Sequence, residues 1–472
     1  MTSIHRTQVV KPDLTQDAHT ARLAQWVTGL QWRDIPAAVR HEALRSLVNY
    51  FAVALAAAND PTIEKALRVM QPFSSVSASG GTATLVGHCE RVDSLHAAAI
   101  NAMAANVYDY DDTHIPTIVH PTAPVASALF ALAQTRVVTG TEFLLAFIAG
   151  IEIECRIANA ISPGHYARGW HITSTCGVFG SAAATAKILG LTEQQIVWAF
   201  GNAAAQSAGL VETLGSSAKS ISVGNAARNG LLSALLAQAN FEGPAAPLEG
   251  AFGFLKVVSD SVNWAALDGE TPQRWQLQCN TYKPYPCGVV LNPVIDACLE
   301  IASRPDFMAR GTEGIQHMEI TGHPLLRQRT DRPNVSNGRQ SQVSAQHTVG
   351  VVLTRQRAGL AEFSDDAVAD SRVRALGAKL TFSDNASMSI DSANLRVTYA
   401  DGFSLTATID TARGSLANPM TDAQLEAKLH TLCDYGQSGV QAQALIDTVW
   451  QLESSTDAGS LMAHAVPKTM KL

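Results

Sequence analysis

The chain has 472 residues and a formal net charge of −7, with 46% hydrophobic and 16% charged residues. The acidic balance excludes the basic surface that binding to a nucleic-acid backbone requires, and the longest apolar run, residues 143–151, is too short to cross a membrane. A chain of this length can bury a substantial core and is expected to divide into two or three units.

The N-terminus and the cysteines both favour a cytoplasmic protein. The first residues contain no apolar segment of the kind that a secretory signal needs. The seven cysteines are scattered, odd in number and free of Cys-x-x-Cys spacing. This pattern is typical of buried thiols in a reducing compartment and not of disulfide or zinc sites.

From residue 19 to residue 267 the sequence predicts one helix after another, behind a polar and unpatterned tail over residues 1–18. Apolar residues recur at helical spacing over residues 41–58 and would form one buried face. Four Ala-rich segments that allow close packing predict further helices, over residues 93–107, 121–134, 177–189 and 224–239.

The character of the chain changes after residue 267. Residues 316–320 predict a strand, and residues 395–399 and 404–409 predict two strands joined by a turn at Asp401-Gly402. Residues 420–435 predict a return to helix. The predicted fold class is therefore mainly α, with a helical domain over 19–267, a smaller α+β domain over 268–410 and a C-terminal return to the helical domain over 411–472.

Residues 109–114 (Asp-Tyr-Asp-Asp-Thr-His), followed by His120, form the densest polar cluster in the chain. Three acids and two histidines within twelve residues can bind a metal or transfer protons, but they can also form a solvated acidic loop. The apolar helices predicted on both sides and the mixed polar types favour a functional site.

His171 follows Gly169-Trp170 and precedes a run of hydroxyl residues that opens a predicted helix. The free N–H groups and the dipole at a helix N-terminus favour anions. A single histidine in such a place is also compatible with a purely structural role.

Two lysines stand in segments that can face a ligand. Lys219 lies in the Gly- and Ser-rich segment 214–220, which lacks the spacing of a phosphate-binding loop. Lys283 is followed by two prolines, which hold it on an extended segment near the predicted change of domain, where pockets are common. An exposed surface position is the alternative for Lys219. Cys287, at the end of the segment that carries Lys283, has no neighbouring base in the sequence that would make it a nucleophile.

Together these segments, in this order, resemble the MmgE/PrpD family. The resemblance covers about residues 20–450 and is carried by Asp109 to Thr113 with His120-Pro121, Gly169-Trp170-His171, Lys219 before residues 224–230, residues 283–287, Asp401-Gly402, Arg413-Gly414, Asn418-Pro419-Met420 and Lys428. It implies a helical domain with a smaller α+β lid domain, a homodimer, and an enzyme that needs no cofactor and no metal.

The resemblance also implies an activity. The expected enzyme is a lyase acting on a small di- or tricarboxylate, either a dehydratase of the 2-methylcitrate type or a decarboxylase of the cis-aconitate type. Both reactions pass through a carbanion next to a carboxylate, so cationic groups would stabilise the developing charge and a histidine would move the proton.

Seven residues are assigned to the site by this resemblance. The catalytic set that it implies consists of Asp109, Thr113, His120, His171, Lys219 and Lys283. The substrate would be bound by Lys219, Lys283, His171 and His347.

The sequence departs from the family pattern at several positions. His347 stands where family members often have Tyr, and Asn49 stands where the first helix usually has Asp. The spacing from Thr113 to His120 is one residue longer than in the decarboxylase pattern. An epimerase of an imino- or amino-dicarboxylate in the same site therefore stays open.

Two alternatives belong to other classes of protein. One is a non-catalytic carboxylate-binding protein. The other is a metal-dependent hydrolase that would use Asp109, Asp111, Asp112, His114 and His120.

Overall fold

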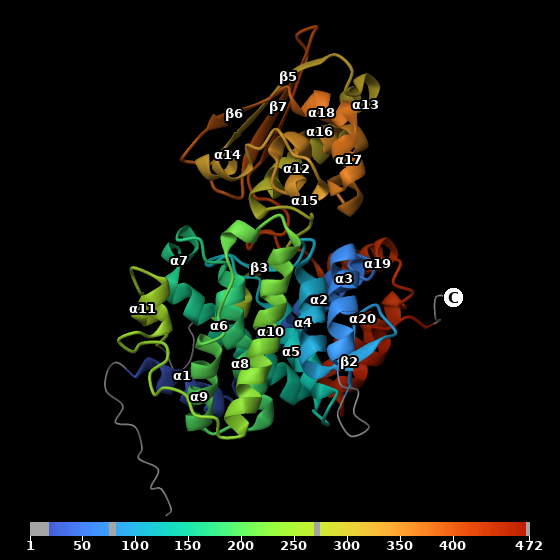
Figure 1. Cartoon of the computed structure of the whole chain (residues 1–472). Helices are drawn as coiled ribbons and strands as arrows, with labels where there is room; N and C mark the ends of the chain where they lie inside the picture. The colour runs from blue at the N-terminus through green and yellow to red at the C-terminus, as the bar shows by residue number, and fades with distance from the viewer. Residues whose placement is uncertain (1–17, 75–81, 269–273, 469–472) are drawn as a thin grey trace, which may run out of the picture.

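The computed structural model describes residues 18–74, 82–268 and 274–468, so that the tail expected over residues 1–18 lies almost wholly outside the described residues. The chain forms a large helical domain with a smaller α+β lid domain above it (Figure 1). The predicted fold class is confirmed. None of the helices in the described ranges is long and apolar enough to span a membrane.

The helical domain is built from the first half of the chain and from its C-terminal end. Its helices are α1 (His19–Gly29), α2 (Ala37–Ala56), α3 (Pro61–Met70), α4 (Ser94–Asn106), α5 (Thr122–Ala133), α6 (Gly140–Ile161), α7 (Gly164–Ala167), α8 (Ile172–Leu189), α9 (Glu193–Ala204), α10 (Ser217–Gln238), α11 (Phe254–Val258), α19 (Asp422–Tyr435) and α20 (Ala442–Trp450). Two short pairs of antiparallel strands join them: β1 (Thr82–Thr84) with β2 (Arg91–Asp93), and β3 (Asp112–His114) with β4 (Asn280–Tyr282).

Small residues let the central helices α6, α8 and α10 approach one another closely. A Cβ atom added at Gly230 of α10 would come within 2.6 Å of the Val178 carbonyl oxygen of α8, and one at Gly150 of α6 would come within 2.7 Å of the Gly180 carbonyl oxygen. Substitution at either glycine would force the helices apart. The small residues of α8 and α10, where Ala-rich helices were predicted, therefore have a direct packing role.

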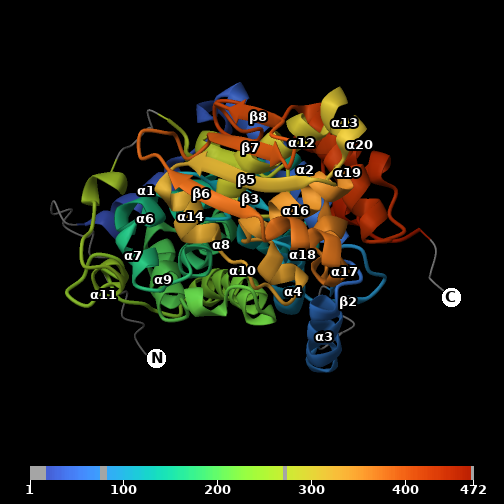
Figure 2. The same cartoon turned by 90° about the horizontal axis from the view of Figure 1, so that it is seen from above.

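The lid domain is a four-stranded sheet with helices packed against it, seen from above in Figure 2. The strands are β5 (Ile315–Gly322), β6 (Leu380–Asp384), β7 (Ala393–Tyr399) and β8 (Ser404–Ile409), in the order β6-β5-β7-β8. The helices are α12 (Asn292–Ala302), α13 (Pro305–Arg310), α14 (Pro324–Thr330), α15 (Gly338–Ser341), α16 (Ala345–Arg355), α17 (Asp365–Ala369) and α18 (Ser371–Gly377). The predicted strands β5, β7 and β8 are present, and β6, which pairs in parallel with β5, is an addition.

The boundary between the domains differs from the one predicted at residue 268. Trp275, Leu277 and Tyr282 are buried in the core of the helical domain, whereas the separate core of the lid begins at Tyr285. Strand β4 pairs with β3, which ties this segment to the helical domain. The chain therefore enters the lid at about residues 283–285, directly after Lys283.

Candidate active site

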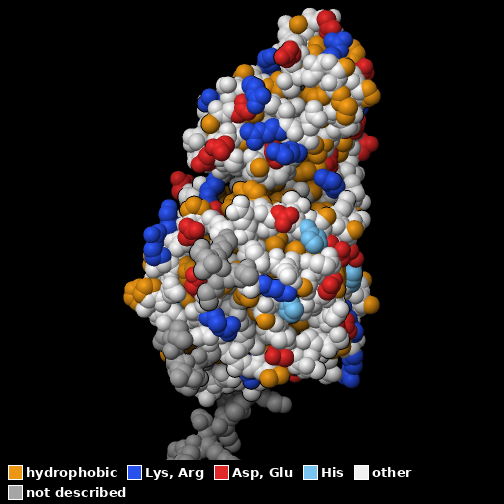
Figure 3. Space-filling view, turned by 90° about the vertical axis from the view of Figure 1, so that its right-hand side faces the viewer, with side chains coloured by type: hydrophobic (Ala, Val, Ile, Leu, Met, Phe, Trp, Pro, Cys, Tyr) orange, Lys and Arg blue, Asp and Glu red, His pale blue; other side chains and the backbone are white. Residues whose placement is uncertain are grey.

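A cavity of about 640 Å³ lies between the helical domain and the lid. In the space-filling view the lid stands as a narrower body on top of the helical domain (Figure 3). From the helical domain the cavity is lined by Asp109, Thr113, His120, His171, Lys219 and Lys283, among others. From the lid it is lined by a group that includes Arg329, Arg332, Arg339 and Gln342. The structure thus brings six of the seven predicted site residues to one place.

Asp109 lies in the turn that follows α4, and this turn is tightly held. The backbone N–H of Asp109 donates to the Asn106 carbonyl at 3.0 Å, and Asp109 adopts a left-handed conformation with φ of 52°. Few residues other than glycine adopt this conformation, although aspartate tolerates it better than most. The hydroxyl of Tyr110 donates to the Pro284 carbonyl at 2.8 Å, which fixes the turn to the segment that carries Lys283.

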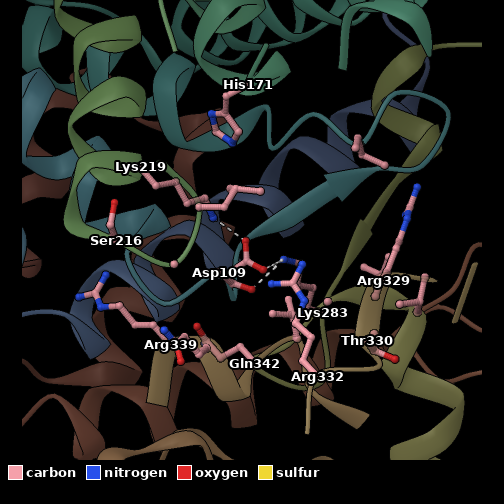
Figure 4. A pocket seen from close by; sticks show the side chains of 18 of the residues that line it. Asp109, His171, Ser216, Lys219, Lys283, Arg329, Thr330, Arg332, Arg339 and Gln342 are labelled. Atoms are coloured by element: carbon pink, nitrogen blue, oxygen red, sulfur yellow. Dashed lines mark hydrogen bonds and ion pairs between the residues drawn. The ribbon is translucent and has the colours of Figure 1, made fainter. Parts of the chain in front are cut away.

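Two lysines meet on Asp109 (Figure 4). The ammonium group of Lys219 lies 2.6 Å from Oδ1 of Asp109, and that of Lys283 lies 3.2 Å from Oδ2 and donates to the main-chain carbonyl at 2.7 Å. The β3–β4 pairing places Lys283 there, because Asp112 is paired with Tyr282. Lys219 lies in the first turn of α10, which begins at Ser217 and therefore earlier than predicted.

The two lysines decide the charge of Asp109. Burial opposes ionisation of this carboxyl group, but the ammonium groups of Lys219 and Lys283 outweigh burial and hold its pKa well below the ordinary value. A carboxylate at the centre of two ammonium groups keeps both of them oriented toward the cavity. Asp109 and the two lysines together carry a net positive charge, which suits an anionic ligand.

His120 is held in one tautomer by the backbone. Its Nδ1 lies 2.6 Å from the Asp112 carbonyl oxygen, which can only accept, so Nδ1 carries the hydrogen and Nε2 is left for the cavity. The Thr113 hydroxyl lies 3.3 Å from the same Nδ1, and Nε2 is 3.8 Å from Oδ1 of Asp109. Burial, reinforced by Lys283 and Lys219 and opposed by the carboxylates of Asp111 and Asp109, lowers the pKa of His120 and so favours the neutral ring.

His171 occupies the N-cap position of α8, at the N-terminus where it was predicted. Its Nδ1 is 2.7 Å from the hydroxyl of Ser174, one turn into the helix. Burial, followed by repulsion from Lys219 and His120, lowers the pKa of His171 to about 3. The cavity therefore holds two neutral imidazoles beside two ammonium groups.

His347 was predicted to bind substrate, and the structure does not support this role. The residue is buried in the first turn of α16, outside the cavity lining, where Nε2 donates to the Glu362 carbonyl at 2.8 Å and the ring packs against Phe363. The lid contributes Arg339 and Gln342 to the cavity from the segment just before α16.

The lid residues of the cavity were not predicted from the sequence. Arg329 lies in the last turn of α14 and Arg332 just beyond its end, in a basic stretch that is the only local signal for them. Arg339 is neutralised by Asp60 at 3.3 Å, whereas Arg329 and Arg332 form no ion pair within the described residues. Both are exposed, so they present free guanidinium groups to the cavity.

The structure gathers only part of the metal-ligand set that a hydrolase would use. Potential ligand atoms of Asp109, Asp111 and His120 lie within 4.8 Å of one another. His114, however, bonds to Thr117 and Gln276. The carboxylate oxygens of Asp109 already have the ammonium groups of Lys219 and Lys283 at 2.6 and 3.2 Å, and these would repel a divalent cation bound there. The donor set therefore fits a metal ion poorly.

Lys428 links the segments that form the floor of the site. Its buried ammonium group donates to the carbonyls of Tyr110 and Lys283 at 2.9 and 2.8 Å and to Oδ1 of Asn49 at 2.8 Å. Burial lowers its pKa well below the ordinary value, and Lys283 adds to this effect. Asn49 stands where the family usually has Asp, and it still accepts a hydrogen bond from Lys428 of α19 but supplies no negative charge.

Asp112 lies behind His120 and is predicted to make stability depend on pH. Burial raises its pKa to about 7 from an ordinary value of 3.8, although Thr122 and Asn280 donate to it. A carboxyl group whose pKa is higher in the folded state than in the unfolded state stabilises the fold at pH values below its ordinary pKa. This stabilisation is lost as the pH rises through about 7.

Replacing Asp112 by Asn removes this titration. The stability of Asp112→Asn relative to the natural protein should therefore rise between about pH 4 and pH 7.5, by on the order of 2–4 kcal/mol. Chemical unfolding across this range measures the difference. The exposed Asp366→Asn serves as the control, and a constant difference for Asp112→Asn would contradict the burial argument.

The two parts of the chain match the two domains of one family. Residues 21–266 match the MmgE/PrpD N-terminal domain, and residues 285–453 match the MmgE/PrpD C-terminal domain. A cis-aconitate decarboxylase from Aspergillus terreus (strain NIH 2624 / FGSC A1156) is 27% identical over 477 residues, which cover 94% of this chain and 95% of the relative.

Two further relatives have similar names. The cis-aconitate decarboxylase-like protein oryM of Aspergillus oryzae is 26% identical over 477 residues, covering 94% of this chain and 96% of its own. Human cis-aconitate decarboxylase is 26% identical over 419 residues, covering 85% of each chain. Together the two domain matches cover most of the sequence, and the chain belongs to the MmgE/PrpD family.

Proposed function

We propose that the protein is a cofactor-independent lyase that decarboxylates a small unsaturated polycarboxylate of the cis-aconitate type. One observation carries the proposal: Asp109 holds two lysine ammonium groups beside two neutral histidines in a cavity between two domains. The names of the relatives favour decarboxylation over dehydration.

This arrangement suits the charge that develops during decarboxylation. Cleavage of the C–C bond releases carbon dioxide and leaves its electron pair on the substrate, where the double bond and a neighbouring carboxylate delocalise it. Lys219 and Lys283 stabilise the oxygens that receive this charge, and one such preorganised donor contributes about 3 kcal/mol. A proton from Nε2 of a histidine then forms the new C–H bond.

The neutral histidines must first take up a proton for this step. Burial lowers the pKa values of both rings, together with Lys283 and Lys219 at His120 and with Lys219 at His171. A bound polyanion acts in the opposite direction, because negative charge near Nε2 favours the imidazolium form. Substrate binding and histidine protonation are therefore coupled, and the proton that is used is replaced from solvent.

The free arginines of the lid support a substrate with more than one carboxylate. Arg329 extends from the lid toward the helical domain, and in Figure 4 it lies on the side of the cavity opposite Lys219. Lys219 and Lys283 already face the reacting part of the cavity. A second carboxylate, remote from the reacting carbon, can pair with Arg329 or Arg332.

Replacing Arg329 or Arg332 by Met is expected to raise KM by about 10- to 100-fold, since a hydrogen bond to a charged group contributes roughly 1.5–3 kcal/mol. The value of kcat should change much less. Steady-state kinetics on the polycarboxylate measures both. Arg327→Met is the matched control, because Arg327 lies on α14 like Arg329 but pairs with Asp384 and does not line the cavity. An unchanged KM for both variants would contradict this binding role.

The activity itself is tested by incubating the purified protein with cis-aconitate, 2-methylcitrate, citrate and iminodisuccinate, followed by mass spectrometry. The expected result is a product that has lost the mass of carbon dioxide, and this activity should be retained after dialysis of the protein against EDTA. Loss of the mass of water would identify a dehydratase, and changed chirality at constant mass an epimerase. Binding without conversion would identify a carboxylate-binding protein, and each of these three outcomes would overturn the proposal.

A further inference from the structure

A chain of three hydrogen bonds leads from His171 into the core between α8 and α10. Nδ1 of His171 lies 2.7 Å from Oγ of Ser174, and Oγ of Ser174 lies 2.6 Å from Oγ of Ser222. The hydroxyl of Ser222 then reaches the main-chain carbonyl of Lys219 at 2.8 Å. The chain therefore begins at one cavity residue and ends on the backbone of another.

The last member of this chain determines the direction of every bond in it. A carbonyl oxygen only accepts, so the single hydroxyl hydrogen of Ser222 is donated to Lys219. Ser174 must then donate to Ser222, and its own oxygen is left to accept from His171. The ring hydrogen of neutral His171 consequently lies on Nδ1.

We infer that Ser174 and Ser222 are positioning residues that hold the hydrogen of His171 on Nδ1 and thereby confine proton exchange at this ring to Nε2, which faces the cavity. As a role in catalysis this inference rests on the proposed function. As a statement about the tautomer of His171 it does not.

The backbone around His171 supports the same arrangement. The N–H of His171 donates to the Gly209 carbonyl at 3.0 Å, and Gly209 has φ of 142°. A Cβ atom at Gly209 would come within 2.6 Å of the Ser174 Cβ atom. Only glycine lets this segment approach closely enough to fix the position of His171 relative to Ser174.

His120 reaches the same tautomer by a different route. Its Nδ1 hydrogen is held directly by the Asp112 carbonyl, whereas that of His171 is held through two serines. Both histidines thus present an unprotonated Nε2 to the cavity when neutral. The serine chain also links His171 to the turn of α10 that positions Lys219, so a shift of one would be transmitted to the other.

Nitrogen NMR of protein labelled with 15N-histidine tests the tautomer without substrate. The signals of His171 are identified by their loss in His171→Gln. In the natural protein at neutral pH we expect a protonated Nδ1 and an unprotonated Nε2. Ser174→Ala and Ser222→Ala should mix the two tautomers, whereas Ser222→Thr, which keeps the hydroxyl, should restore the original pattern.

A matched control is available on the same helix. The buried hydroxyl of Ser220 has no hydrogen-bond partner within the described residues, so Ser220→Ala should leave the His171 signals unchanged. The signals of the other histidines report whether each variant remains folded. A protonated Nε2 in the natural protein, or an unchanged tautomer in both alanine variants, would overturn the inference.

The kinetic consequence is measured on the substrate that the protein converts. Ser174→Ala and Ser222→Ala should each lower kcat by about tenfold, as expected for the loss of one hydrogen bond, with KM nearly unchanged and a displaced limb of the pH–rate profile. Equal losses in Ser220→Ala would overturn the positioning role. Failure of the proposed function would instead appear as absence of turnover with the tautomer pattern intact.

Discussion

Replacing Lys219 or Lys283 by Met is expected to lower kcat/KM by about 30- to 1,000-fold, which corresponds to a loss of roughly 2–4 kcal/mol of transition-state stabilisation. Each lysine touches Asp109 and faces the cavity, so each is placed to stabilise charge on the carboxylate oxygens of the substrate. Methionine keeps the length and apolar stem of the side chain but removes the ammonium group. Steady-state kinetics on the converted polycarboxylate measures the effect.

Two controls separate a lost charge from a damaged fold. Lys65→Met changes an exposed lysine of α3 that does not line the cavity, and should keep normal kinetics. Circular dichroism and thermal melting report whether the site variants are folded. The double variant should lose less than the sum of the single losses, because the two lysines share Asp109. Near-normal kcat/KM in both single variants would show that the mechanism proposed for this site is wrong.

The sequence predicts the helical domain well because its signals are local. Apolar spacing and Ala-rich segments identify α2, α4 and α5, and the same small residues explain how α8 and α10 pack. The turn at Asp401-Gly402 likewise identifies the hairpin β7–β8. Each of these elements is specified by residues within the element itself.

The parts of the site that depend on distant contacts were harder to predict. Strands β3 and β4 have three residues each and are too short for an alternating pattern, yet their pairing brings Lys283 to Asp109. The segment Gly215-Ser216 resembles a loop, but α10 already begins at Ser217 with Ser216 in the N-cap position. Lys219 is therefore held by a helix and not by a flexible loop.

The lid shows most clearly what sequence reasoning omits. A position can be assigned to a site by resemblance, but the direction of its side chain depends on the packing of the whole domain. His347 points to Glu362 and Phe363, while Arg329 and Arg332, which carry no motif, line the cavity. Binding groups contributed by a second domain are visible only once that domain is placed over the first.

The helical domain and the lid also divide the chemistry between them. Asp109, the two lysines and both histidines belong to the helical domain, and they are fixed to one another through β3, β4 and α10. The lid supplies positive charge from exposed side chains. We therefore expect changes in the lid to act mainly on KM and changes in the helical domain mainly on kcat.

Replacing His120 by Gln is expected to lower kcat by about 100- to 10,000-fold with KM nearly unchanged, which is the usual contribution of a positioned acid or base. Gln keeps a polar side chain of similar length at this position, while the group that exchanges a proton is lost. The pH–rate profile should change as well. An imidazolium that gives its proton to carbon is available only below its pKa, so the activity of the natural protein should fall as pH rises, and this alkaline limb should be absent in His120→Gln.

The matched control for this variant is His114→Gln. His114 is a buried histidine of the same segment whose pKa burial lowers to about 4, but it bonds to Thr117 and Gln276 and does not line the cavity. This control should keep its kcat and its alkaline limb, measured at a temperature at which it is folded. If His120→Gln also keeps both, the proton is carried by His171. Ser174→Ala and Ser222→Ala, which act on the tautomer of that ring, would then have to show the larger loss of kcat.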